Sequence, residues 1–133
     1  MCDDTNSCTT NEACSGGVCT GVGDPLPQVV DDGVSVSRSA GVATITWTPA
    51  IDSAASAVLR GLVSGLPVRP GGADEVCLAD GIVDGAATDA EDPNPGHAFW
   101  YLIQGTNNCG RGPYGSRTLN GVPTAPRVSS TSP

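Results

Sequence analysis

The sequence predicts an all-β protein in which a small disulfide-rich unit precedes one β-sandwich. Its runs of β-branched and aromatic residues are short and separated by turn residues, a spacing typical of a sandwich or barrel. Residues 43–47 alternate with a period of two, which places Ala43, Ile45 and Trp47 on one face of a strand. Four of the six cysteines lie in residues 1–23, where almost no large apolar residue is available to form a core.

The cysteine content also indicates the compartment. The chain has 133 residues, enough for one domain and a small appendage, and its six cysteines could form three disulfides in an oxidising environment. We therefore expect a secreted or cell-surface protein. The first four residues contain neither a basic nor an apolar signal region, so we expect any signal peptide to have been removed or to lie upstream.

Charge and hydropathy exclude two classes of partner. The net charge is −8, and all six basic residues are arginines scattered along the chain, so no basic stripe is available for nucleic acid. No run approaches the roughly 18 apolar residues of a membrane span. We expect neither nucleic acid binding nor a membrane span.

Composition divides the chain into four parts. Residues 1–23 are a cysteine-rich unit, and residues 24–33 form a linker broken by proline. Residues 34–121 contain the predicted sandwich. Residues 122–133 are rich in Pro, Ser and Thr, which is typical of an extended tail that cannot form a core.

Seven strands are expected in the sandwich. They cover residues 33–39, 43–48, 55–60, 75–79, 86–89, 99–106 and 114–119. Residues 99–103 are apolar on both faces, so this strand is either covered on both sides or leaves one face exposed for a partner.

Residues 34–121 resemble a fibronectin type III domain of the variety found in secreted bacterial multi-domain proteins. The likeness rests on four segments: ATITW at 43–47, AVLRG at 57–61, PGHAFWYLI at 95–103 and NNCGRGPYG at 107–115. The resemblance implies a seven-stranded immunoglobulin-like sandwich and a disulfide between Cys77 and Cys109. Phe99 stands where the family usually has a tyrosine, so the corner hydrogen bond of that tyrosine is either missing or supplied by Tyr101.

The N-terminal unit resembles the short cysteine-rich repeats of secreted surface proteins. The matching segments are CTTNEAC at 8–14 and SGGVC at 15–19. Three pairings of the four cysteines are open. The four are Cys2, Cys8, Cys14 and Cys19.

Metal binding has two candidate forms in this unit. Zinc is disfavoured, because the cysteines are separated by five, five and four residues and an oxidising compartment favours disulfides. Calcium is the stronger candidate, since oxygen ligands gather in one loop-rich segment, although their order does not match an EF-hand. The alternative is a solvated acidic loop. The candidate ligands are Asp3, Asp4, Asn6 and Glu12.

No constellation for catalysis is evident, so we expect a protein that is not an enzyme and needs no cofactor, calcium aside. His97 is the one histidine, and it lies beside a Pro-Gly turn without a matching nucleophile. Trp100 and Tyr114 are candidate contacts for a protein partner or a glycan, with packing inside the domain as the alternative.

Two functions are compatible with these features. The first is a non-catalytic extracellular structural or adhesive module, such as a subunit of a surface filament, which contacts copies of itself or other surface proteins through its tail and sheet edges. The alternative is a carbohydrate-binding or spacer module of a larger secreted hydrolase. A fold of this class is compatible with either.

Overall fold

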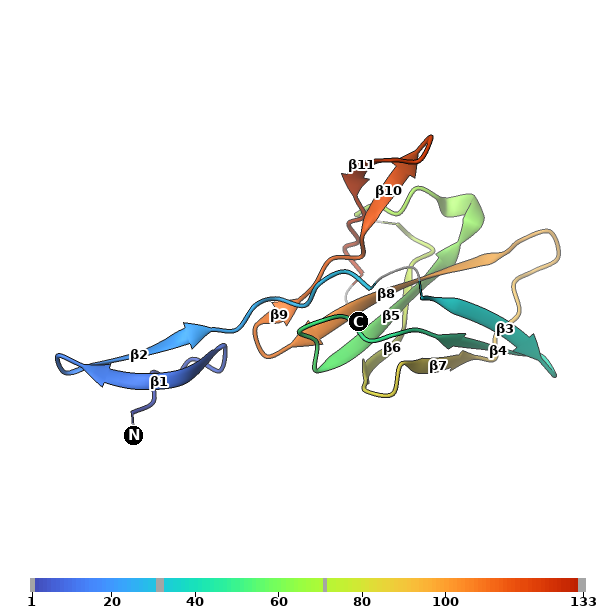
Figure 1. The fold of residues 1–133 in the computed structure, drawn as a ribbon. Coiled ribbons are helices and arrows are strands. Elements are labelled where there is room, and N and C mark those ends of the chain that lie inside the picture. Colours follow the sequence, from blue (N-terminus) through green and yellow to red (C-terminus); the bar gives the residue numbers. More distant parts are fainter. Residues whose placement is uncertain (1, 31–32, 71, 132–133) are drawn as a thin grey trace.

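The computed structural model describes residues 2–30, 33–70 and 72–131, and these residues form an all-β protein (Figure 1). One short 3-10 turn, Val63–Gly65, interrupts the strands. The strands are β1 (Thr9–Ser15), β2 (Val18–Gly23), β3 (Ser35–Ser39), β4 (Val42–Thr46), β5 (Ala55–Leu62), β6 (Val76–Ile82), β7 (Ala86–Asp89), β8 (Phe99–Asn107), β9 (Gly110–Arg111), β10 (Ser116–Leu119) and β11 (Val122–Pro126). Among the described residues, no helix has the length and hydrophobicity of a membrane span.

Two antiparallel sheets form the body of the molecule. One has the strand order β3-β4-β7 and the other the order β6-β5-β8-β9. The strands of both sheets contribute to one buried apolar cluster, so the two sheets pack against each other. The cluster consists of Ile45, Trp47, Val58, Ala87 and Ile103.

The alternation predicted for residues 43–47 is confirmed. Ala43, Ile45 and Trp47 are buried, whereas Thr46 is exposed. The indole nitrogen of Trp47 donates a hydrogen bond to the Ser56 hydroxyl oxygen at 3.0 Å, which satisfies its one polar group inside the core. The strand is thus fixed to the core by its apolar face.

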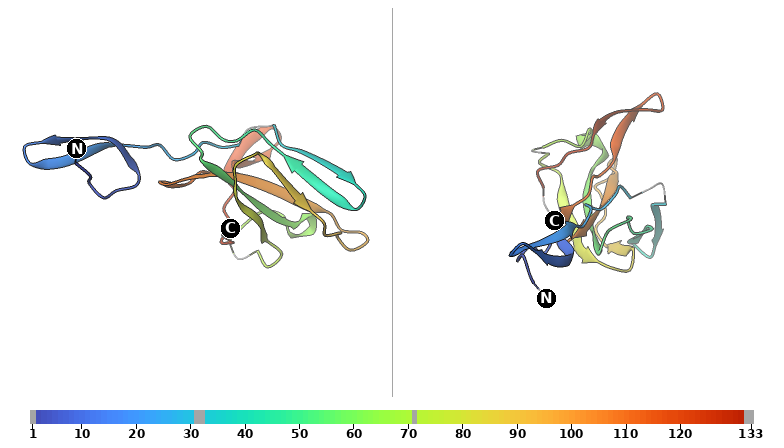
Figure 2. Two further views of the ribbon diagram at one scale, coloured as in Figure 1. Left: turned by 90° about the horizontal axis from the view of Figure 1, so that it is seen from below. Right: turned by 60° about the vertical axis from the view of Figure 1, so that its left-hand side comes forward.

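The last predicted strand, residues 114–119, is wrong in its role. β10 pairs with neither sheet but forms a separate hairpin with β11, which stands away from the body (Figures 1 and 2). Asn120 and Gly121 have φ angles of 51° and 79°, as a tight two-residue hairpin turn requires. The first part of the expected tail, 122–133, is therefore a strand.

The expected linker, residues 24–33, is not a free joint where the structure describes it. The Pro27 side chain is fully buried, and the Gln28 N–H donates to the Ile51 carbonyl oxygen at 3.0 Å. Val29 forms an isolated antiparallel bridge with Gln104 of β8. The segment therefore lies on the body, and Asp31 and Asp32 lie outside the described residues.

β1 and β2 form a hairpin at the end of the body (Figure 1). All of their residues are exposed or half-buried. We call residues 2–23 the cap. Its hairpin has no apolar core of its own, as the composition predicted.

Candidate functional site

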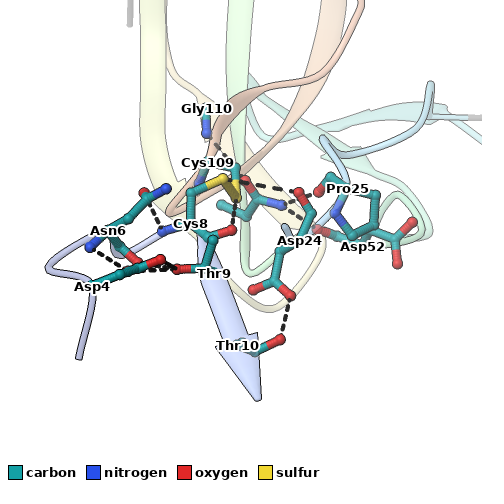
Figure 3. Close-up of a disulfide and its surroundings, with 11 residues drawn as sticks. Asp4, Asn6, Cys8, Thr9, Thr10, Asp24, Pro25, Asp52, Cys109 and Gly110 are labelled. Carbon is teal, nitrogen blue, oxygen red and sulfur yellow. Dashed lines mark hydrogen bonds between the residues drawn. A yellow bond between two sulfur atoms is a disulfide. The ribbon is translucent and has the colours of Figure 1, made fainter. Parts of the chain in front are cut away.

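The cap is bonded covalently to the body. Cys8, just before β1, forms a disulfide with Cys109 in the turn between β8 and β9, and the two Cα atoms are 4.6 Å apart (Figure 3). The Asp24 N–H donates to the Cys8 carbonyl oxygen at 2.8 Å, so the exit of the cap also lies at this bond. The disulfide and this hydrogen bond together hold the start of β1 and the end of β2 at the body.

The disulfide between Cys77 and Cys109 that the resemblance implied is wrong. Cys77 lies in β6, which is separated from β8 by β5, and it is an exposed free thiol. Strands two positions apart in a sheet are roughly 10 Å apart, beyond the Cα separation that a disulfide allows. Cys109 instead lies beside Cys8, just before β1.

Asn107 braces the same junction. Its side-chain nitrogen donates to the carbonyl oxygens of Pro25 at 2.8 Å and Asp52 at 2.9 Å. Its side-chain oxygen accepts from the N–H groups of Cys109 at 2.9 Å and Gly110 at 3.1 Å. One amide thus connects the linker, the β4–β5 loop and the β8–β9 turn. The sequence hinted only at the local turn, because the other partners are remote in sequence.

The other cysteines of the cap do not pair as expected. Cys2 bonds Cys19, with Cα atoms 5.8 Å apart, which is one pair of one of the three open connectivities. Cys8 bonds Cys109 instead of a cysteine of the cap, so no connectivity within the cap is complete and two disulfides form instead of three. Cys14 is an exposed free thiol opposite Cys19 in the hairpin. The sulfur atoms of Cys2, Cys14 and Cys19 lie within 4.8 Å of one another.

The structure brings together three of the four candidate calcium ligands. Carboxylate oxygens of Asp3, Asp4 and Glu12 lie within 4.8 Å of one another. Each also accepts a backbone N–H: Asp3 from Thr5 at 2.6 Å, Asp4 from Asn6 at 2.9 Å and Glu12 from Asp4 at 3.3 Å.

The fourth candidate, Asn6, is engaged in the same turns, because its side-chain oxygen accepts from the Cys8 N–H at 3.1 Å. These bonds give the acidic loop a structural role, stabilising turns of the cap without an ion. Calcium binding here stays a prediction.

The body contains a cluster of charged side chains around the buried Arg60. Arg60 of β5 pairs with Asp89 of β7 at 2.9 Å and with Glu91 at 2.8 Å, and its guanidinium lies 4.2 Å from the centre of the Phe99 ring. The Tyr101 hydroxyl donates to Asp89 at 3.0 Å. Tyr101 therefore bonds a carboxylate across the two sheets, and not the backbone of a corner.

These contacts shift the pKa values of the group. Burial alone would raise the pKa of Asp89, but hydrogen bonds from Arg60, the Glu91 backbone and Tyr101 outweigh it and lower the pKa. Burial and the bond to Asp89 raise the pKa of Tyr101 to about 12. Asp89 is thus held charged and the Tyr101 phenol neutral, so the hydrogen bond between them is maintained.

Trp100 and Tyr114 do not form a shared exposed surface. Tyr114 is only 8% exposed, so for this residue the alternative of packing inside the domain holds. Trp100 is half-buried, its ring lies against Gly61, and its indole nitrogen donates to the Leu62 carbonyl oxygen at 2.9 Å. His97 is exposed in the turn before β8.

The outer edge of β8 is the candidate interaction site. β8 pairs with β5 from Phe99 to Thr106 on one side. On the other side, β9 covers only Thr106 and Asn107, and Val29 bridges Gln104. Within the described ranges, no segment pairs with this side between residues 99 and 102, so we call residues 99–102 the open edge.

A groove of about 290 Å³ lies along this edge. It is lined by three consecutive residues of β8, and neighbouring side chains of a strand point to opposite faces, so the groove follows the strand's rim. Its lining combines apolar and aromatic side chains with the charged Arg127. It includes Val30, Val34, Tyr101, Leu102, Ile103 and Tyr114.

Comparison with known proteins identifies no family. No family model matches the chain, and no curated protein matches it. A solved structure of a Fn3-like protein from Clostridium thermocellum is similar at a TM-score of 0.43 and 20% sequence identity, over 80% of this chain and 86% of that one. Similarity of this degree carries no argument about function, and the description of the fold rests on the two sheets.

Proposed function

We propose that the chain is a non-catalytic extracellular structural or adhesive module that assembles with copies of itself through its sheet edges. The observation that carries this proposal is the open edge of β8 beside a groove of mixed apolar and polar lining. An unpaired strand edge exposes backbone donors and acceptors that another strand can complete. The two disulfides support an extracellular location, because such bonds persist in oxidising compartments.

The tail contributes differently from what the composition suggested. Arg127 N–H donates to the Gly115 carbonyl oxygen at 2.8 Å, and Thr131 donates from its hydroxyl to the Glu75 carbonyl oxygen at 3.3 Å. Residues 127–131 thus lie on their own domain. The hairpin of β10 and β11 is the part that protrudes, and Val122 within it is 61% exposed.

The alternative, a carbohydrate-binding or spacer module, has less support. Stacking on a sugar needs exposed aromatic faces, and Tyr114 is buried while Trp100 is covered on one side by Gly61. A spacer has no need of an open edge.

Light scattering and electron microscopy of the purified chain over a concentration series test the proposal. We expect oligomers or filaments whose fraction grows with concentration. A chain that stays monomeric at every concentration and binds immobilised glycans through Trp100 would contradict the proposal and support the alternative. The matched control is Trp100→Phe, which keeps an aromatic ring but lacks the indole.

A further inference from the structure

We propose that the open edge of β8 accepts β10 of a second copy, so that the four-stranded sheet is completed between chains. This inference rests on the proposed function, because it names the contact through which the copies assemble. It follows from three features: the backbone groups of the open edge, the linker that keeps the chain's own hairpin away, and the unpaired edge of β10.

The open edge presents backbone groups in the correct alternation. The Gly112 N–H donates to the Gly105 carbonyl oxygen at 2.8 Å on the outer side of β8, and the Val63 N–H donates to the Ala98 carbonyl oxygen at 2.8 Å on the β5 side. Since alternate residues of a strand bond to opposite sides, the N–H and C=O groups of Phe99 and Tyr101 point outward. They are placed to pair with an incoming strand.

The linker separates the chain's own β10 from this edge. Val29 bridges Gln104, so it lies between β9 and the open edge. The Gly112 backbone lies against the Pro27 carbonyl, where any side chain at Gly112 would clash, and the Gln104 side chain donates to the Gly112 carbonyl oxygen at 2.5 Å. The chain therefore leaves β8 after β9, and the hairpin extends outward (Figure 1).

The hairpin itself needs a partner. Among the strands of the described residues, β10 and β11 pair with each other and with no third strand, and an isolated two-stranded hairpin is marginally stable in water. β10 has four residues, the same length as the open edge. Pairing would thus stabilise the hairpin and cover the edge at once.

Only one edge of the hairpin can accept a strand. Leu119 and Val122 flank the two-residue turn and form its hydrogen-bonded pair, so the N–H groups of Ser116 and Thr118 point away from β11. On the far edge, Pro123 and Pro126 occupy the outward positions and have no N–H to donate. β10 is therefore the pairing edge.

Replacing Thr118 with proline tests the inference. Thr118→Pro removes an outward N–H but spares the bonds to β11, and Thr118→Val is the matched control that keeps the N–H and the β-branched shape. By sedimentation equilibrium, we expect Thr118→Pro to weaken self-association at least about tenfold and Thr118→Val to leave it near wild type. The thermal unfolding midpoint of the monomer checks that both variants fold.

Hydrogen exchange of the wild-type chain provides a second readout that needs no variant. We expect the Phe99 and Tyr101 amides to exchange quickly in dilute monomer and slowly after assembly. Assembly that persists in Thr118→Pro with both amides still exposed would overturn this inference and leave the proposed function standing. Slow exchange of both amides in the dilute monomer would show that the chain's own hairpin covers the edge, and would also overturn it.

Discussion

The cap and the two-sheet body are stabilised by different means within one chain. In the body, Ile45, Val58 and Leu59 are fully buried, so apolar burial supplies the driving force. In the cap, no described residue of the hairpin is buried, and its structure depends on the Cys2–Cys19 disulfide and on side chains that bond turn backbone. A segment too small for a core can thus be ordered if covalent bonds and turn hydrogen bonds replace burial.

Removal of the Cys8–Cys109 disulfide, which joins the cap to the body, should cause the largest loss in the free energy of unfolding. Cys8→Ala with Cys109→Ala opens a bridge that spans 101 residues, and the chain-entropy model gives a loss of about 4 to 5 kcal/mol in the free energy of unfolding. Urea denaturation of the body measures it. Cys77→Ser, which removes a free exposed thiol, is the control and should change the free energy of unfolding by less than about 0.5 kcal/mol. A double variant as stable as Cys77→Ser would show that the bridge does not stabilise the body.

Within the body, the buried charge pair should be the next most sensitive point. Asp89→Asn leaves Arg60 without its buried carboxylate, and we expect a loss of about 3 to 4 kcal/mol in the free energy of unfolding. Asp92→Asn is the matched control, because that side chain is 71% exposed in its pair with Arg38 and should contribute less than about 1 kcal/mol. A similar loss in both variants would contradict the role of burial.

The same carboxylate predicts a pH dependence of the body. Its pKa is lowered in the folded state, so its stabilising contribution is fully present above the unfolded value of about 3.9 and is lost as the pH falls through the folded value. Wild type should therefore lose stability below about pH 4 more steeply than Asp89→Asn does. Urea denaturation at a series of acidic pH values provides the comparison, and parallel curves would show that Asp89 is not the titrating group.

Calcium should have the smallest effect, confined to the cap if it occurs. Asp3, Asp4 and Glu12 already accept backbone N–H bonds, so we expect a chelator to leave the thermal midpoint of the chain unchanged. Scanning calorimetry with chelator and with millimolar calcium measures this. A calcium-dependent rise in the midpoint that Glu12→Gln abolishes would establish the ion site instead.

Local sequence patterns predicted the core strands of the body, but they did not predict how the remaining segments contact one another. The period of two at residues 43–47 and the apolar run at residues 99–103 gave two core strands, because burial of one face leaves a direct trace in sequence. The hairpin of β10 and β11 was missed although Asn120-Gly121 is a strong turn signal, since the prolines after it favoured a linker. Pro123 and Pro126 occupy positions of β11 that point away from β10, so the hairpin needs no N–H group there.

The junction could not be predicted at all. Cys8 meets Cys109 and Asn107 meets Pro25 across most of the chain, and no local spacing records such a contact. Tyr114 is likewise buried although nothing in its local sequence marks it as a core residue. Such features depend on how elements come together, which a single sequence does not encode by periodicity.

Residue-resolved hydrogen exchange under a disulfide reductant tests the contrast between cap and body most directly. We predict that the amides of Ala13 and Thr20 in the cap hairpin lose their protection when both disulfides are reduced. The amides of Ile45 and Val58 in the core should exchange faster by no more than the contribution of the Cys8–Cys109 bridge and should keep protection that the cap has lost, because their burial remains. Protection that persists in the cap, or that is lost in both regions together, would contradict the conclusion that disulfides order the cap and apolar burial orders the body.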